Sequence, residues 1–116
     1  MSEASQKFPK TNRLLRRDEF RRAYEEGRKF QARYFTAFVL PNSLDRARVG
    51  ITVTRKFGKS VRRNRARRLV REVFRRNKWL VPAGVDIVIN VKNSLMEARL
   101  SDLESDFLAF AERLTR

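Results

Sequence analysis

Hydrophobic and polar residues recur with two different periods along this chain, and the period separates helices from strands. In residues 17–26, Phe20, Ala23 and Tyr24 recur at helical spacing. Gly27 follows them, and a glycine in this place is typical of a left-handed stop. The pattern predicts a short helix over residues 17–26 that ends at Gly27.

Two segments with strand-like alternation come next. Residues 33–40 and 46–54 are separated by "PNSLDR", a run of turn-forming residues, so they predict an antiparallel hairpin. In the first segment the alternation places bulky side chains on both faces, and one face is expected to stay open. In the second segment Val49, Ile51 and Val53 face one side, and the opposite face carries only small groups that leave room for a ligand.

A basic stretch, residues 55–78, holds twelve Lys or Arg residues and one acid, Glu72, yet an apolar repeat runs through it. Its apolar positions have the spacing of an amphipathic helix. They are Ala66, Leu69, Val70, Val73 and Phe74. On a helical wheel the opposite side carries what we call the arginine stripe. The stripe consists of Asn64, Arg65, Arg67, Arg68, Arg71, Arg75 and Arg76.

The last part of the chain predicts one more strand and one more helix. "PAG" at residues 82–84 interrupts the chain, and residues 85–91 form a short, mostly apolar strand. Residues 101–114 follow as an amphipathic helix whose predicted capping box pairs Ser101 with Glu104. The side chains predicted to point inward are Leu103, Phe107, Leu108 and Phe110.

The order of these elements is αββαβα, which predicts an α+β fold. We expect a two-layer sandwich in which helices pack on a small mixed sheet, with a βαβ unit around the basic helix. Residues 1–12 are polar and lack periodicity, so we expect a mobile N-terminal arm. Residues 13–116 are then a single domain, in keeping with a chain of 116 residues.

Composition narrows the possible functions. The formal net charge of +15 makes a densely negative partner favourable, and nucleic acid is the obvious candidate. There is no cysteine and no histidine, which excludes disulfides, thiolate zinc sites, thiol nucleophiles and Ser-His pairs. No apolar run approaches the roughly 20 residues of a membrane helix, and the first residues lack a signal-peptide centre. We therefore expect a cytoplasmic protein without a membrane partner.

The arginine stripe has three interpretations. A solvated helix face is the ordinary fate of a charge run, but such faces mix charge signs, and here only Glu72 supplies the opposite sign. A membrane-surface or calmodulin-binding helix needs spare apolar surface, and this helix needs its apolar side for its own sheet. Contact with nucleic acid uses the forked donors of arginine and the amide of Asn64.

Residues 48–75, "RVGITVTRKFGKSVRRNRARRLVREVFR", closely resemble the protein subunit of bacterial ribonuclease P. The resemblance is carried by Arg63-Asn64-Arg65, followed by Arg67-Arg68 and Arg71, and it extends over Arg13 to Val91. It implies a fold similar to the ribosomal protein S5 domain 2-like fold, with a left-handed βαβ crossover. This would be an exception, because crossovers between parallel strands are right-handed in about 98% of cases. It also implies a protein without catalytic residues that assists a catalytic RNA in Mg²⁺-dependent removal of the 5′ leader from precursor tRNA.

The same resemblance implies two binding sites. The site for the catalytic RNA comprises Lys59, Arg63, Asn64, Arg65, Arg67, Arg68, Arg71 and Arg75. A cleft between the first helix and the sheet would hold the precursor tRNA leader, through Phe20, Tyr24, Phe38, Thr52, Arg55 and Lys56. Exposed aromatic side chains beside cations suit the stacking of single-stranded bases, although simple core packing explains these aromatics equally well. The implied partners are one ribonuclease P RNA and precursor tRNA, with Mg²⁺ held mainly by the RNA, no metal site on the protein and no small-molecule substrate.

Three rival functions remain at this point. A structural RNA-binding protein of the ribosomal type would need the arginine stripe but no leader cleft. A metal-dependent nuclease would need clustered carboxylates, and those of Asp102, Glu104 and Asp106 do not share one helix face. A DNA-binding protein would insert the basic helix into a major groove, and double-stranded DNA would then compete as well as structured RNA.

Overall fold

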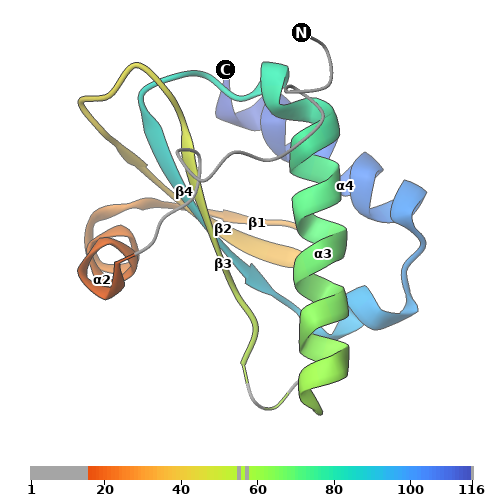
Figure 1. Cartoon of the computed structure of the whole chain (residues 1–116). Coiled ribbons are helices and arrows are strands. Elements are labelled where there is room, and N and C mark those ends of the chain that lie inside the picture. The colour runs from red at the N-terminus through yellow and green to blue at the C-terminus, as the bar shows by residue number, and fades with distance from the viewer. Residues whose placement is uncertain (1–15, 55, 57, 116) are drawn as a thin grey trace, which may run out of the picture.

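The computed structural model describes residues 16–54, 56 and 58–115; the arm predicted at residues 1–12 lies outside this part of the chain. The sheet has the order β1-β2-β4-β3 and consists of β1 (Arg28–Gln31), β2 (Phe35–Pro41), β3 (Arg48–Thr52) and β4 (Val85–Val91). The helices are α2 (Arg17–Glu26), α3 (Ser60–Asn77) and α4 (Leu100–Leu114). Helix α2 lies on one side of the sheet, and α3 and α4 lie on the other (Figure 1).

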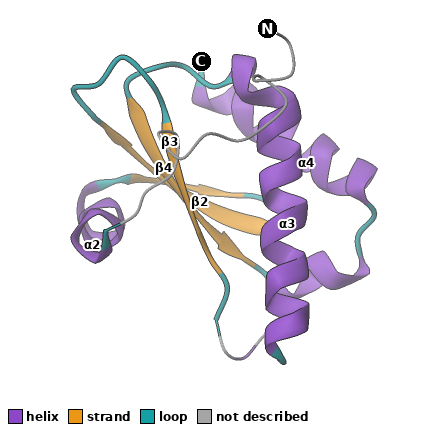
Figure 2. Ribbon diagram, viewed as in Figure 1, coloured by secondary structure: helices purple, strands orange, loops and turns teal. Residues whose placement is uncertain are grey.

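The sheet is mixed. Strands β3 and β4 run parallel and are joined by α3, whereas β4 pairs with β2, and β2 with β1, in antiparallel fashion (Figure 2). The α+β class, the helices packed on a small mixed sheet and the βαβ unit are therefore confirmed. The left hand of the crossover stays a prediction. Strand β1 was not predicted, because "RKFQ" offers one apolar residue among polar ones, a composition suited to the edge of a sheet.

The predicted hairpin of β2 with β3 is wrong. Strand β4 lies between them, and β2 instead forms a hairpin with β1. Four successive residues of β4, from Asp86 to Ile89, are buried, and a strand covered on both faces belongs in the centre of a sheet. The loop after β2 is tied to the start of β4, since the Asn42 backbone N–H donates to the Gly84 carbonyl oxygen over 2.8 Å.

The two faces of β4 enter two separate apolar clusters. Ile87 and Ile89 point toward α3 and α4 and join the main core, whose largest fully buried side chains are Phe74, Phe107 and Phe110. Val88 points the other way and packs with Ala23 of α2. Helix α2 therefore rests on a much smaller apolar contact than α3 and α4 do.

Two predicted helix ends need correction. Gly27 follows α2 with φ of −77°, so it is not left-handed. A Cβ atom there would lie 2.4 Å from the Ala23 carbonyl oxygen, and close approach of the backbone explains the glycine. Helix α4 begins at Leu100, and its N-cap residue is Arg99. The Arg99 backbone N–H donates to the Asp102 carboxylate over 3.0 Å. The capping box of Ser101 and Glu104 is therefore wrong.

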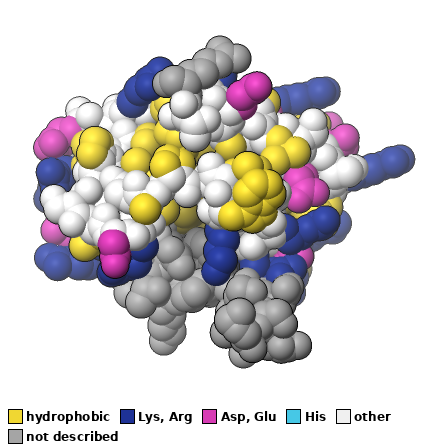
Figure 3. All heavy atoms as spheres, turned by 90° about the horizontal axis from the view of Figure 1, so that it is seen from above, with side chains coloured by type: hydrophobic (Ala, Val, Ile, Leu, Met, Phe, Trp, Pro, Cys, Tyr) yellow, Lys and Arg dark blue, Asp and Glu magenta, His cyan; other side chains and the backbone are white. Residues whose placement is uncertain are grey.

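Large apolar side chains are exposed at the end of the molecule where α3 finishes. Trp79, in the 3₁₀ turn η3 (Lys78–Leu80), is 77% exposed. Leu108 of α4 is 43% exposed, which corrects the prediction that it points inward. Seen from this end, hydrophobic side chains gather in the middle of the face, with Lys and Arg side chains around its edge (Figure 3). Among the described residues, no helix is long and apolar enough to span a membrane.

Candidate nucleic-acid interfaces

Helix α3 divides into an inner and an outer side as predicted. Ala66, Val70, Val73 and Phe74 are buried against the sheet and α4, and Leu69 is half-buried beside them. The arginine stripe covers the outer side. Its exposed members are Asn64, Arg65, Arg68 and Arg76, and its half-buried members are Arg67, Arg71 and Arg75. The inner side is buried in the core, so only the outer side is available to a partner.

The C-terminal end of the arginine stripe is partly neutralised by acids. The Arg75 Nε donates to Glu72 over 3.0 Å, and a second hydrogen bond joins the Arg75 Nη2 to the same carboxylate. These bonds lower the pKa of Glu72 and raise the pKa of Arg75, because each stabilises the charged form of its partner. Arg76 lies 3.6 Å from Glu104 of α4. Of the predicted RNA-binding residues, Arg75 is therefore engaged within its own helix.

The first turns of α3 keep their positive charge. In the described part of the chain, Arg62, Arg65 and Arg68 form no salt bridge. The Arg67 side chain donates to the Asn64 Oδ1 over 3.1 Å, and the amide N–H groups of Asn64 donate to none of the described residues. Arg63 is half-buried, and its Nε has no hydrogen-bond partner among the described residues. Unneutralised donors therefore concentrate between the exposed Lys59, which precedes the helix, and Arg68.

A second group of side chains meets between α2 and the sheet, and we call it the α2–sheet surface: Tyr24, Phe38, Thr52 and Asn90. The Tyr24 hydroxyl donates to the Asn90 Oδ1 over 2.8 Å, and the Thr52 hydroxyl donates to the same oxygen. The rings of Tyr24 and Phe38 meet edge to face with centroids 5.0 Å apart. Tyr24 is 39% exposed, so one aromatic ring is fixed in place and still open to solvent.

The structure places the six predicted leader residues differently. Phe20 and Phe38 are half-buried against Ala23 and Val88, so they mainly support α2. Tyr24 and Thr52 meet on the α2–sheet surface, as described above. Lys56 is exposed beyond the end of β3. Arg55 lies outside the described residues.

One member of the α2–sheet surface, Asn90, and one of its neighbours, Lys29, were not predicted as site residues. Asn90 is a polar residue in an apolar strand, and its spacing of two residues from Val88 places both side chains on the face of β4 that α2 covers. The Lys29 Nζ lies 5.9 Å from the centroid of Phe38. Lys29 was missed because its strand, β1, was missed.

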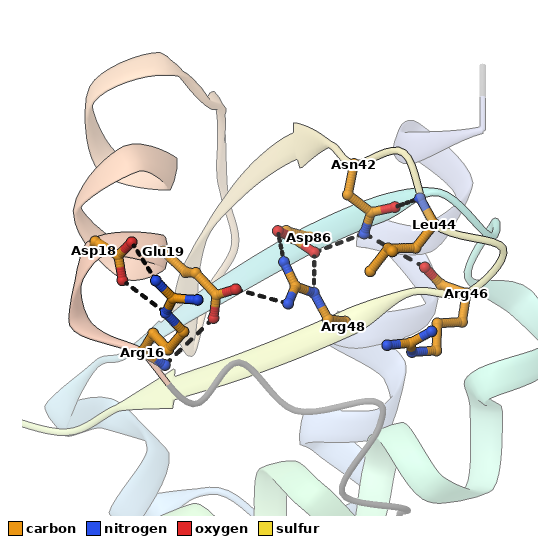
Figure 4. Close-up of polar contacts among 8 residues, drawn as sticks. All are labelled: Arg16, Asp18, Glu19, Asn42, Leu44, Arg46, Arg48 and Asp86. Atoms are coloured by element: carbon orange, nitrogen blue, oxygen red, sulfur yellow. Dashed lines mark hydrogen bonds and ion pairs between the residues drawn. The ribbon is translucent and has the colours of Figure 1, made fainter.

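A partly buried ion-pair network, also absent from the prediction, fastens α2 to the sheet (Figure 4). The Arg48 Nη1 donates to Glu19 over 2.7 Å, and its Nη2 donates to Asp86 over 2.8 Å. The Arg48 Nε also donates to Asp86, and the Asn42 amide donates to Asp86 over 2.7 Å. The hydrogen bonds to Asp86 raise the pKa of Arg48. The network links α2, β3 and β4, and so holds the α2–sheet surface together.

Acidic residues do not form a metal centre in the part of the chain that the structure describes. No group of three or more His, Cys, Asp or Glu side chains there is arranged to hold a metal ion. Asp106, one of the acids considered for a nuclease, accepts the backbone N–H groups of Arg33 and Tyr34 over 3.1 and 2.8 Å. Its carboxylate therefore closes the turn between β1 and β2, and we assign it no metal.

Comparison with known proteins points to one family. Residues 8–115 match the family described as Ribonuclease P. The ribonuclease P protein component of Thermotoga maritima is 44% identical over 93 residues, which cover 80% of each chain. That of Desulfovibrio desulfuricans is 39% identical over 113 residues, covering 94% of this chain and 87% of the relative. A solved structure of the ribonuclease P protein from Thermotoga maritima superimposes with a TM-score of 0.80 at 37% identity, covering 87% of this chain and 96% of the other.

A match that spans nearly all of the chain, together with relatives of this similarity, establishes the family. Its members are protein subunits of a tRNA-processing endonuclease, in which they work with a catalytic RNA. The chain belongs to the ribonuclease P protein component family.

Proposed function

We propose that the chain binds ribonuclease P RNA through the arginine stripe and holds the 5′ leader of precursor tRNA on the α2–sheet surface. The observation that carries the first half is the exposed pair Arg65 and Arg68, which form no salt bridge among the described residues and lie on the side of α3 turned away from the core. Arginine guanidinium groups match phosphate oxygens, and each phosphate contact releases counterions.

The second half rests on the α2–sheet surface. A single-stranded leader exposes base faces that stack on aromatic rings, and Tyr24 offers a ring held by Asn90 and Phe38. Lys29 and Lys56 are exposed cations that suit the leader backbone. The two proposed surfaces are on different sides of the sheet, so catalytic RNA and leader can bind at once (Figure 1).

In this proposal the RNA carries out the hydrolysis. Mg²⁺ bound to the RNA would supply an activated water and stabilisation of the charge that develops on the cleaved phosphodiester. The protein binds, orients and neutralises phosphates, which needs no histidine or cysteine. We expect one protein for each RNA, and the predicted cytoplasmic location stays a prediction.

Reconstitution tests the proposal. Purified protein, ribonuclease P RNA and a precursor tRNA are combined at moderate Mg²⁺, and cleavage at the 5′ end is measured beside protein-only and RNA-only reactions. We expect stimulation over RNA alone and no cleavage by protein alone. Absence of stimulation would contradict the proposed role, and cleavage by the protein alone would revive the nuclease alternative.

The leader surface needs a separate measurement. The affinity of the holoenzyme for precursor tRNA should exceed its affinity for mature tRNA, and Tyr24→Ala should narrow this gap because it removes the exposed ring. Equal affinity of the wild-type holoenzyme for both tRNAs would leave RNA binding intact and favour the structural RNA-binding alternative.

A further inference from the structure

Trp79 is the only tryptophan of the chain, and it lies on the surface immediately after α3. Its neighbours Leu80 and Val81 pack against the core, whereas Trp79 is 77% exposed. Tryptophan is highly buried on average, because its ring is a large apolar surface whose removal from water is favourable. An indole left in solvent beside an RNA-binding helix is therefore available to a partner.

The indole lines a hollow of about 330 Å³ between η3, the loop after η3 and the start of β3. Buried Val49 and Phe74 lie among its lining residues, and Arg46 and Lys78 supply its charges. Lys78 forms no salt bridge in the described part of the chain, and Arg46 lies 3.7 Å from the exposed carboxylate of Asp45. The hollow thus combines apolar lining, one aromatic ring and cations.

A second hollow of about 600 Å³ lies on the other side of Trp79, against α4. Its lining includes Leu108, and its charged lining residue is Glu112. A carboxylate repels phosphate, so this larger hollow is the poorer match for RNA. A nucleotide is therefore expected in the hollow lined by Arg46 and Lys78, because these cations attract phosphate.

We propose that the hollow lined by Trp79, Arg46 and Lys78 binds an unpaired base of the ribonuclease P RNA. The base stacks on the indole, and Lys78 and Arg46 hold the adjacent phosphate. Stacking on an aromatic side chain is favourable for every base, and cations beside it steer the backbone. The volume lies at the lower end of the roughly 300–1,000 Å³ range of small-ligand pockets.

A second copy of the chain is a less suitable occupant. Each copy carries a formal net charge of +15, so bringing two together at this face raises their electrostatic repulsion, whereas RNA relieves it. The inference rests on the proposed binding of the catalytic RNA. It adds a contact at the far end of α3, beyond the unneutralised arginines near its start.

The single tryptophan makes a direct test possible. Full-length protein is titrated with ribonuclease P RNA while indole emission and its quenching by acrylamide are recorded. Stacking should quench the emission and reduce the access of acrylamide to the ring. If both signals are unchanged when the RNA has saturated the protein, the inference is overturned.

Variants separate stacking from other roles of this face. Trp79→Ala should weaken RNA binding by about tenfold, and Trp79→Phe should recover part of the loss because a ring remains. The matched control is Leu108→Ala, which removes an exposed apolar side chain from the other hollow and should leave the affinity unchanged. Equal affinities for wild type and Trp79→Ala would contradict the proposal.

Two further measurements keep the result unambiguous. Light scattering on free protein tests self-association; dimers that Trp79→Ala abolishes, with RNA affinity unchanged, would assign the face to a second copy and overturn the inference. Melting curves check folding, and if Trp79→Ala is unfolded the fluorescence of the wild-type protein decides. If Arg68→Ala binds ribonuclease P RNA more weakly and Trp79→Ala binds it as tightly as wild type, the proposed function is supported and the Trp79 site is excluded.

Discussion

Residues of the same type on the same side of α3 differ in what they can still bind. Arg75 already donates two hydrogen bonds to Glu72, whereas Arg68 is exposed and has no salt bridge in the described chain. Binding RNA through Arg75 requires an existing ion pair to be exchanged or shared, and binding through Arg68 does not. An arginine without an acidic partner in its own chain is therefore expected to contribute more to RNA binding than one that already has such a partner.

Arg68→Ala should weaken binding to ribonuclease P RNA by about tenfold, since a hydrogen bond to a charged group contributes about 1.5–3 kcal/mol. The slope of log affinity against log salt should fall by up to about one unit, because one phosphate contact is lost. Filter binding over a range of salt concentrations measures both. The control Arg22→Ala removes an exposed cation of α2 that pairs with Glu26, and it should change the slope much less. An unchanged slope in Arg68→Ala would exclude Arg68 from the interface.

Tyr24→Phe separates the ring of Tyr24 from its hydroxyl. The substitution removes the hydrogen bond to Asn90 and should lower the free energy of unfolding by about 1 kcal/mol. The ring and its edge contact with Phe38 remain, so the preference for precursor over mature tRNA should persist. Urea unfolding and tRNA competition measure the two effects. Loss of the preference in Tyr24→Phe, with the fold intact, would mean that the hydroxyl and not ring stacking recognises the leader.

At the scale of elements, α2 is the helix that depends most on polar contacts. It rests on the small cluster around Ala23 and Val88 and on the network of Arg48 with Glu19 and Asp86. The acids hold the two ends of one guanidinium group, so a single side chain connects α2 to β4 through β3. The position of Tyr24, and with it the α2–sheet surface, follows from this attachment.

Arg48→Ala should therefore lower the free energy of unfolding by about 3 kcal/mol, because Asp86 is buried and would lose its cation. Urea unfolding measures the loss, and faster amide exchange in α2 would locate it. Arg22→Ala is again the control, since it breaks an exposed pair of the kind that contributes little. If the two variants are equally stable, the network does not fasten α2.

The whole molecule carries far more positive than negative charge. With 28 basic and 13 acidic side chains, most cations lack an acid to pair with, and the folded chain repels itself. Salt screens this long-range repulsion between exposed charges, but it screens the few partly buried pairs, such as Arg48 with Asp86, much less. Because the repulsion outweighs these few pairs, the stability of the free protein is expected to rise as salt is added.

Raising NaCl from about 0.05 to about 0.5 M should raise the melting temperature of the free protein by several degrees, corresponding to about 1 kcal/mol. Thermal unfolding followed by circular dichroism measures it. A melting temperature that falls as salt rises would mean that attractive pairs outweigh the repulsion. The same salt should weaken RNA binding, because counterion release opposes it.

Sequence patterns predicted some elements closely and others not at all. The bounds of α2 and β4 agree with the prediction, because α2 has a clear period and ends at a glycine, and β4 is a short apolar run that follows a Pro-Ala-Gly break. The missed strand β1 has one apolar residue, too few to show a period. The pairing of β2 with β3 was wrong, because alternation along a strand does not say which strand lies beside it.

The sequence by itself determined the three helices, the three strands other than β1, the apolar inner side of α3, its basic outer side and the family. These are properties of spacing and composition within one segment, where each side chain's direction follows from its position in the helix or strand. Only the tertiary structure decided that β4 separates β2 from β3, that Arg48 joins α2 to the sheet, and that Trp79 stays in solvent. Those features depend on contacts between residues far apart in the chain, and periodicity within a segment carries no information about them.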